Sequence, residues 1–150
     1  MIKVLVAALF AVVLSSPPFS PVALAAAAQI VAITLQDVSV DPSISGMVIK
    51  VDPAKVKAGS VTLEAINQSK NLAHEVLVIP ALPEGRELPY DTKKDTIVEK
   101  RVHSLGEISE LKPGVGGKLT LNLKPGTYLL LCNQPGHYKS GMSTKLVVEK

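Results

Sequence analysis

The chain has one cysteine, no tryptophan and only five aromatic residues among 150. A single cysteine excludes an internal disulfide and the paired Cys-x2-Cys arrangements that hold structural zinc. The net charge of +3 is small, and no basic block is interleaved with aromatic residues. The sequence therefore lacks the usual signature of a nucleic-acid-binding surface, and we expect no nucleic acid among its partners.

The pattern of residues 1–28 predicts a secretory signal peptide. A basic start at Lys3 precedes eleven consecutive apolar residues, Val4 to Leu14, and small residues from Ala23 offer cleavage after Ala25 or Ala28. Eleven apolar residues are fewer than the roughly 20 that a bilayer span needs, so we expect no stable membrane anchor. The predicted location is the periplasm or an equivalent lumen, with a soluble protein after cleavage. The alternative interpretation is an uncleaved N-terminal anchor.

Residues 29–150 are expected to form one all-β domain. Short runs rich in β-branched residues are separated by proline and glycine turns, which predicts seven to eight strands in a Greek-key β-sandwich. The expected strands cover residues 30–40, 45–51, 61–67, 74–79, 118–123, 127–132 and 143–149, with a short one within 104–111. Residues 95–102 fit either a short helix or an edge strand. Tyr128 is expected to form a tyrosine corner that pins its hairpin.

The most informative segment lies near the C-terminus. Cys132 follows an apolar run, His137 comes five residues later and Met142 five residues after that, with a Pro135-Gly136 turn between the first two. Thiolate, imidazole and thioether suit copper better than calcium or magnesium. A trigonal copper site needs a second imidazole, and His74, at the start of a strand-like run, is the better candidate. His103 lies in a polar segment and is expected to be a solvated loop histidine.

Each of these residues also has a structural interpretation. Cys132 alone fits a buried structural thiol, and Met142 fits core packing at the start of the last strand. His74 fits a strand histidine whose hydrogen bonds are satisfied within the protein. The spacing of the whole set nevertheless favours a metal site over these separate explanations.

Taken together, His74, the loop Cys132-x4-His137-x4-Met142 and the turn Leu123-Lys-Pro-Gly-Thr-Tyr128 before it resemble the cupredoxins, the type 1 copper proteins. The resemblance covers about the last hundred residues. It implies one copper per chain, cycling between Cu(I) and Cu(II), and a one-electron carrier. In similar proteins a residue beside the first histidine hydrogen-bonds toward the cysteine loop. Many members have asparagine directly after that histidine, whereas this chain has Glu75.

The resemblance also implies how the protein works with others. Redox partners, such as a c-type cytochrome or an oxidase or reductase, are expected to dock near His137 on a monomer. The expected rim of this surface consists of Pro135, Gly136, Tyr138 and Met142, with residues 81–83 nearby. Four filled ligand positions leave no place for a substrate, so we do not expect an enzyme. The alternative function is a copper carrier, chaperone or buffer in the same compartment.

Overall fold

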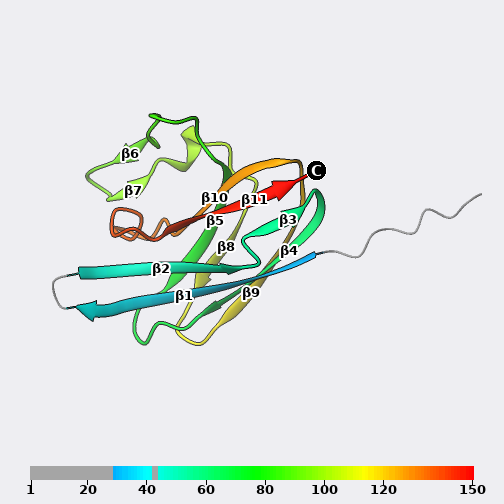
Figure 1. The fold of residues 1–150 in the computed structure, drawn as a ribbon. Helices are drawn as coiled ribbons and strands as arrows, with labels where there is room; N and C mark the ends of the chain where they lie inside the picture. The colour runs from blue at the N-terminus through cyan, green and yellow to red at the C-terminus, as the bar shows by residue number, and fades with distance from the viewer. Residues whose placement is uncertain (1–28, 42–43) are drawn as a thin grey trace, which may run out of the picture.

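The computed structural model describes residues 29–41 and 44–150, which form two large β-sheets packed face to face and a separate two-stranded sheet (Figure 1). The predicted signal peptide, residues 1–28, and its cleavage sites lie outside these residues and stay predictions. Within the described ranges, no helix has the length and apolar character required to cross a membrane.

The first sheet has the strand order β2-β1-β4-β9 and the second has the order β3-β11-β10-β5-β8. The first sheet contains β1 (Gln29–Asp41), β2 (Ile44–Asp52), β4 (Gly59–Asn67) and β9 (Gly116–Leu123). The second contains β3 (Lys55–Lys57), β5 (His74–Pro80), β8 (Gly106–Leu111), β10 (Gly126–Leu131) and β11 (Ser143–Glu149). β1 runs parallel to β4 and β3 parallel to β11, while the other pairs are antiparallel.

This architecture confirms the predicted all-β sandwich. The eight strands of six or more residues correspond to the eight expected segments. Three shorter strands, β3, β6 (Tyr90–Asp91) and β7 (Thr96–Ile97), were not expected as strands of their own. Residues 95–102 contain both β7 and a single 3-10 turn, η1 (Glu99–Arg101), so both interpretations of that segment are partly right.

The main core lies between the two sheets and follows from strict alternation. In β4, Val61, Leu63 and Ala65 are buried and alternate with more exposed residues, as expected for a strand with one face in the core. The facing sheet contributes Val76, Val78 and others to the same cluster. Burial of these branched side chains is the main favourable term that holds the sheets together.

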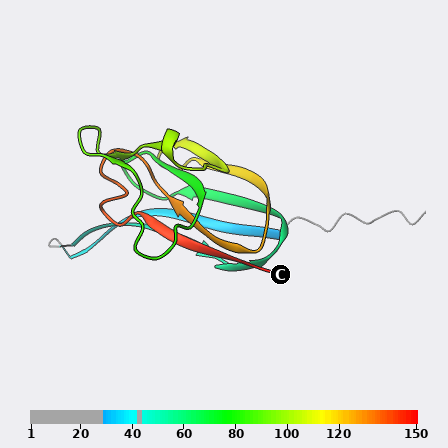
Figure 2. The same ribbon diagram turned by 90° about the horizontal axis from the view of Figure 1, so that it is seen from above.

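A second cluster explains why β5 is apolar without alternation. Leu77 and Ile79 of β5 and Leu131 of β10 point away from the main core and pack against Leu88 and Ile97. The last two residues come from the segment 81–104, which contains β6, β7 and η1 and covers the outer face of the second sheet (Figures 1 and 2). A strand covered on both faces reads as a continuous hydrophobic run.

Strand register brings the predicted metal-binding residues to one end of the sandwich. Leu131, the last residue of β10, pairs with Leu77 of β5 and with Ser143, the first residue of β11. The loop between β10 and β11 therefore emerges beside the start of β5, where His74 lies. At the other end of β10 the hydroxyl of Tyr128 donates a hydrogen bond to the carbonyl of Lys124 at 2.8 Å, which is the expected tyrosine corner.

Candidate metal centre

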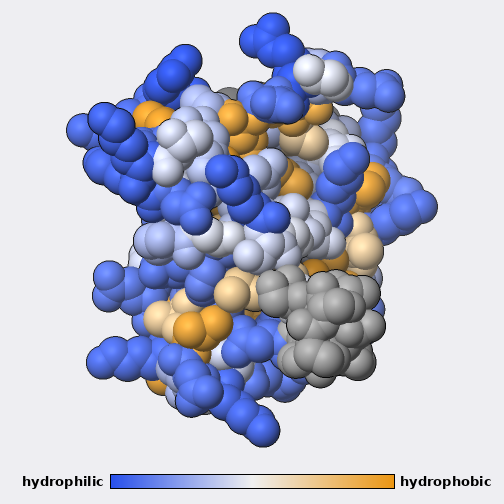
Figure 3. Space-filling model, turned by 90° about the vertical axis from the view of Figure 1, so that its left-hand side faces the viewer, coloured by the Kyte–Doolittle hydropathy of each residue, from blue (hydrophilic) through white to orange (hydrophobic). Residues whose placement is uncertain are grey.

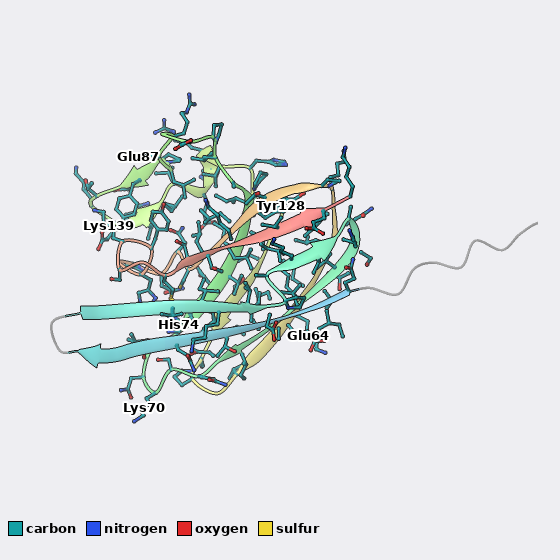
Figure 4. The ribbon with its side chains drawn as sticks, viewed as in Figure 1. Glu64, Lys70, His74, Glu87, Tyr128 and Lys139 are labelled. Atoms are coloured by element: carbon teal, nitrogen blue, oxygen red, sulfur yellow. The ribbon has the colours of Figure 1, made fainter. Side chains whose placement is uncertain are left out.

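Three predicted ligands converge at this end. The Nδ1 atoms of His74 and His137 lie 3.2 Å apart, and the Cys132 Sγ lies 3.4 Å from His137 Nδ1 and 3.9 Å from His74 Nδ1. All three side chains are buried. Figure 4 shows His74 at the end of the sandwich that also carries the loop between β10 and β11.

The distances fit a single metal ion between the three donors. Metal bonds are typically about 2.0 Å to imidazole nitrogen and about 2.3 Å to thiolate sulfur, so two nitrogens on one ion lie within about 4 Å of each other. The separations of 3.2, 3.4 and 3.9 Å are all shorter than the corresponding sums of two bonds. The donor set of two imidazoles and one thiol is therefore spaced for one ion.

Backbone hydrogen bonds of the loop hold the two later residues in place. The Met142 N–H donates to the His137 carbonyl at 3.1 Å, and the Cys132 N–H donates to the Met142 carbonyl at 3.1 Å. Gly136 has a φ of 81° and Gly141 a φ of 88°, both in the left-handed region that favours glycine. These two turns fold the loop back on itself.

Met142 is fully buried and belongs to the same core cluster as Cys132. Its position agrees with the predicted axial thioether and equally with the alternative of core packing. Two imidazoles, one thiolate and a weak thioether are the ligand set of a trigonal copper centre. Among the described residues, His74, Cys132 and His137 form the group of His, Cys, Asp or Glu side chains whose ligand atoms lie close enough together to share one metal ion.

Burial sets the protonation of these groups. It raises the pKa of the Cys132 thiol to about 11, since the thiolate would lose its hydration. Burial also lowers the pKa of His74, with Asp37 opposing the shift, and it lowers the pKa of His137, reinforced by the nearby His74. Neutral imidazoles have a free lone pair for a metal, while the thiol exchanges its proton for the cation on binding.

The second nitrogen of His74 has its own partner. His74 Nε2 lies 3.1 Å from Asp37 Oδ1, and the other oxygen of Asp37 accepts a hydrogen bond from the Ser69 hydroxyl. Asp37 belongs to β1 in the first sheet, whereas His74 begins β5 in the second. Asp37 was not predictable from the sequence, because nothing in its local pattern distinguishes it from a surface carboxylate in a strand.

Glu75, next to His74, hydrogen-bonds toward the cysteine loop, as expected for a residue beside the first histidine. Its carboxylate accepts a hydrogen bond from the Asn133 N–H at 2.9 Å and another from the Gln134 Nε2 at 2.9 Å. Burial raises the pKa of Glu75, and these two hydrogen bonds oppose the shift. Glu75 therefore ties the start of β5 to the cysteine loop and places a buried carboxyl group there.

Asn133, the residue after Cys132, joins the loop to the covering segment. Its side-chain oxygen accepts from the Ile97 N–H, and its amide nitrogen donates to the Ile97 carbonyl at 3.1 Å and to Glu99 Oε1 at 2.7 Å. The Gly136 N–H also donates to the carbonyl of Asp95 at 2.8 Å. Segment 81–104 therefore supports the loop on the side away from β1.

The structure corrects the expected rim around His137. Ala81 to Pro83 follow Pro80, the end of β5 opposite to His74, and Met142 is fully buried. The part of the covering segment that meets the loop is instead Tyr90 to Glu99, since Asn133 donates hydrogen bonds to Ile97 and Glu99. At the other end of this stretch, Lys139 lies 4.3 Å over the Tyr90 ring and the Tyr138 ring lies 6.4 Å from it. Figure 4 shows Lys139 on the loop beside β6 and β7.

Only 9% of His137 is exposed. Pro135 and Gly141 are exposed around it and Tyr138 is half-buried. The end of the molecule that carries the loop faces the viewer in Figure 3, where hydrophilic residues surround patches of intermediate and hydrophobic character. His103 is exposed and does not belong to the cluster, in agreement with its assignment as a loop histidine.

Comparison with solved structures identifies the fold. Auracyanin from Roseiflexus castenholzii superposes with a TM-score of 0.56 at 18% identity, covering 83% of this chain and 98% of that one. Rusticyanin from Thiobacillus ferrooxidans superposes with a TM-score of 0.54 at 20% identity, covering 82% and 79%. Auracyanin B superposes with a TM-score of 0.53 at 20% identity, covering 79% and 88%. No known sequence family and no curated protein sequence matches the chain.

The chain is thus a β-sandwich with a buried His-Cys-His cluster and a buried methionine at one end. Its fold is that of the cupredoxins, which confirms the resemblance drawn from the sequence. The donor set is placed to bind one metal ion, as expected for a mononuclear copper centre.

Proposed function

We propose that this protein is a type 1 copper protein that carries single electrons between redox partners. The observation that carries the proposal is the convergence of His74 Nδ1, His137 Nδ1 and Cys132 Sγ within 3.9 Å of one another in a buried site. The structural neighbours support it, since rusticyanin is described as a copper protein. Copper bound here would supply one-electron chemistry between Cu(I) and Cu(II).

The rigidity of the site supports electron transfer. His74 begins a strand, Cys132 directly follows another, and the loop between Cys132 and Met142 is closed by backbone hydrogen bonds. Ligands held by rigid elements move little when the charge of the metal changes, which lowers the reorganisation that accompanies each transfer. With four ligand positions filled by protein there is no position for a substrate, so we propose a carrier and not an enzyme.

The partner surface is proposed to surround the exposed edge of His137. Pro135, Tyr138 and Gly141 form its nearest surface, with Lys139 and Asp95 adjacent. A small surface of this kind suits a transient complex with a c-type cytochrome, an oxidase or a reductase. Export to the periplasm or an equivalent lumen, and a monomeric state, complete the proposal.

A copper carrier, chaperone or buffer is the second candidate function, because the same ligands serve it. The burial of all three donors favours the electron carrier, since a carrier that releases copper needs an accessible site for ligand exchange. The two are separated by mixing the Cu(I)-loaded protein with a competing chelator. A delivery protein releases its copper rapidly, whereas an electron carrier keeps it through repeated reduction and oxidation.

The experiment that tests the proposal is a visible and EPR spectrum of residues 29–150 after addition of Cu(II), with the metal content measured in parallel. We expect one copper per chain, an intense thiolate-to-copper absorption and a narrow copper hyperfine splitting. Cys132→Ser is expected to abolish the absorption, while His103→Gln, the matched control, leaves it unchanged. A colourless wild-type protein, or an ordinary Cu(II) spectrum, would overturn the proposal.

A further inference from the structure

We propose that Asp37 is a positioning residue of the copper centre, which holds His74 in the tautomer that presents Nδ1 to the metal and favours Cu(II) over Cu(I) through its charge. The inference rests on the proposed function, because it concerns the same site. It starts from the 3.1 Å contact between His74 Nε2 and Asp37 Oδ1.

The two nitrogens of His74 face different groups. Nδ1 faces His137 Nδ1 and Cys132 Sγ at 3.2 and 3.9 Å, whereas Nε2 faces the carboxylate. A neutral imidazole has one protonated and one free nitrogen, and a carboxylate only accepts hydrogen bonds. The proton therefore belongs on Nε2, and this leaves the Nδ1 lone pair directed at the metal position.

The carboxylate is itself held in place. The Ser69 hydroxyl donates to Asp37 Oδ2 and accepts a hydrogen bond from the Leu72 N–H at 3.1 Å, so its own proton is directed at the carboxylate. Asn67 fixes the turn that carries Ser69, since its side-chain oxygen accepts the Ser69 N–H at 2.9 Å. The Asn67 amide nitrogen donates to the carbonyls of Leu72 and Leu111 at 2.8 and 2.7 Å.

This chain of contacts links the two sheets at the metal centre. Asp37 comes from β1, Ser69 from the turn after β4, and His74 from the start of β5. A carboxylate that accepts a hydrogen bond from the second nitrogen of a metal-binding histidine fixes the orientation of the ring and makes it a more basic ligand. A more basic ligand and a nearby negative charge both stabilise the higher oxidation state, so Asp37 is expected to lower the reduction potential.

The charge effect is moderated by water, because the Asp37 side chain is 35% exposed while that of His74 is fully buried. The positioning effect does not depend on this exposure, since it requires only the hydrogen bond. Two substitutions separate the effects. Asp37→Asn keeps an oxygen acceptor and removes the charge, whereas Asp37→Ala removes both.

The test measures Cu(II) affinity, Cu(I) affinity and reduction potential in the full domain. For Asp37→Ala we expect Cu(II) affinity to fall about 10-fold to 100-fold. Cu(I) affinity should change less, so the potential rises by about 59 mV for each tenfold change in the ratio of the two affinities. Asp37→Asn is expected to raise the potential by a smaller amount, and Ser69→Ala, which loosens the carboxylate, by less again.

Glu64→Gln is the matched control, because Glu64 is a carboxylate of the same sheet that pairs with Lys118 and contacts none of the ligands. It should leave the potential and both affinities unchanged. An Asp37→Ala protein with the type 1 spectrum and the wild-type potential and Cu(II) affinity would overturn the inference while leaving the proposed function intact.

A second measurement needs no copper. Nitrogen-15 NMR of the metal-free protein is expected to show His74 protonated on Nε2, with the ring losing this single tautomer in Asp37→Ala and regaining it in Asp37→Asn. If the wild-type protein gave no type 1 spectrum, the proposed function would fail, and this tautomer measurement would still decide the role of Asp37. A His74 ring protonated on Nδ1 in wild type would overturn it.

Discussion

The carboxylate of Glu75 accepts a hydrogen bond from the backbone N–H of Asn133 at 2.9 Å, which joins the residue after His74 to the residue after Cys132. Its other oxygen accepts from the Gln134 side chain. One side chain therefore sets the distance between the strand that carries the first histidine and the loop that carries the other ligands.

Removing this tie is expected to loosen the loop. Glu75→Ala leaves the buried Asn133 N–H without its acceptor, and an unpaired buried donor costs about 1–3 kcal/mol. Urea unfolding of the metal-free protein should show this loss, and the copper-loaded variant should show a shifted visible absorption as the thiolate reorients. Glu75→Gln, which keeps one acceptor oxygen, should lose less, and the exposed Glu84→Ala should lose nothing. Equal stability of Glu75→Ala and wild type would contradict the role assigned to Glu75.

Substitution of Met142 tests whether this residue is an axial copper ligand or only a core residue. Met142→Leu preserves most of the buried volume, so it is expected to cost less than about 1.5 kcal/mol and to retain copper and colour. Loss of a thioether that favours Cu(II) should raise the reduction potential. Met47→Leu, a methionine that packs against the same core outside the metal loop, is the matched control and should leave the potential unchanged. An unchanged potential in Met142→Leu would identify Met142 as a core residue only.

The two sheets pack tightly against each other at Gly117. A Cβ added there would lie 2.5 Å from Ile108 Cγ2 and 3.1 Å from Leu111 Cδ2, both in the buried core. Gly117→Ala is therefore expected to destabilise the protein by about 1–3 kcal/mol through overpacking. The penalty should shrink in an Ile108→Ala background, because that substitution removes the clashing methyl group, and a double-mutant cycle measures the difference. Additive effects in this cycle would show that the clash is relieved elsewhere.

Tyr90 should titrate at unusually high pH. Burial raises its pKa to about 12, assisted by the hydrogen bond from its hydroxyl to Asp95 Oδ1 at 2.6 Å and by the charge of that carboxylate. The folded state then holds the proton more tightly than the unfolded state, so the associated stability is complete below about pH 10 and is lost as the pH rises toward 12. Tyrosinate absorbance, taken as the difference between wild type and Tyr90→Phe, follows this ionisation. Asp95→Asn should move it to lower pH, and an unmoved titration would exclude the role of Asp95.

The amino-acid sequence by itself was sufficient for the fold class and for the identity of the candidate ligands. Alternation in residues 61–67 and 118–123 identified strands with one buried face, because side chains of a strand point to opposite sides in turn. The equal spacing from Cys132 to His137 and from His137 to Met142 is local, so it is visible in the chain without knowledge of its folding. Tyr128 and its corner were predictable for the same reason.

The remaining features depend on contacts between residues far apart in the chain. The residue pairs Asp37–His74 and Glu75–Asn133 are separated by 37 and 58 positions, and each forms only because strand order and register place their elements together. The two-residue strand β6 was not predicted, and β7 was foreseen only as one of two interpretations of residues 95–102, because strands this short show no periodicity. The segment that carries them meets the loop from Tyr90 to Glu99 and not at Ala81. Local pattern determined which side chains this protein offers to a metal, whereas the packing of two sheets and a covering segment determined which groups hold and tune them.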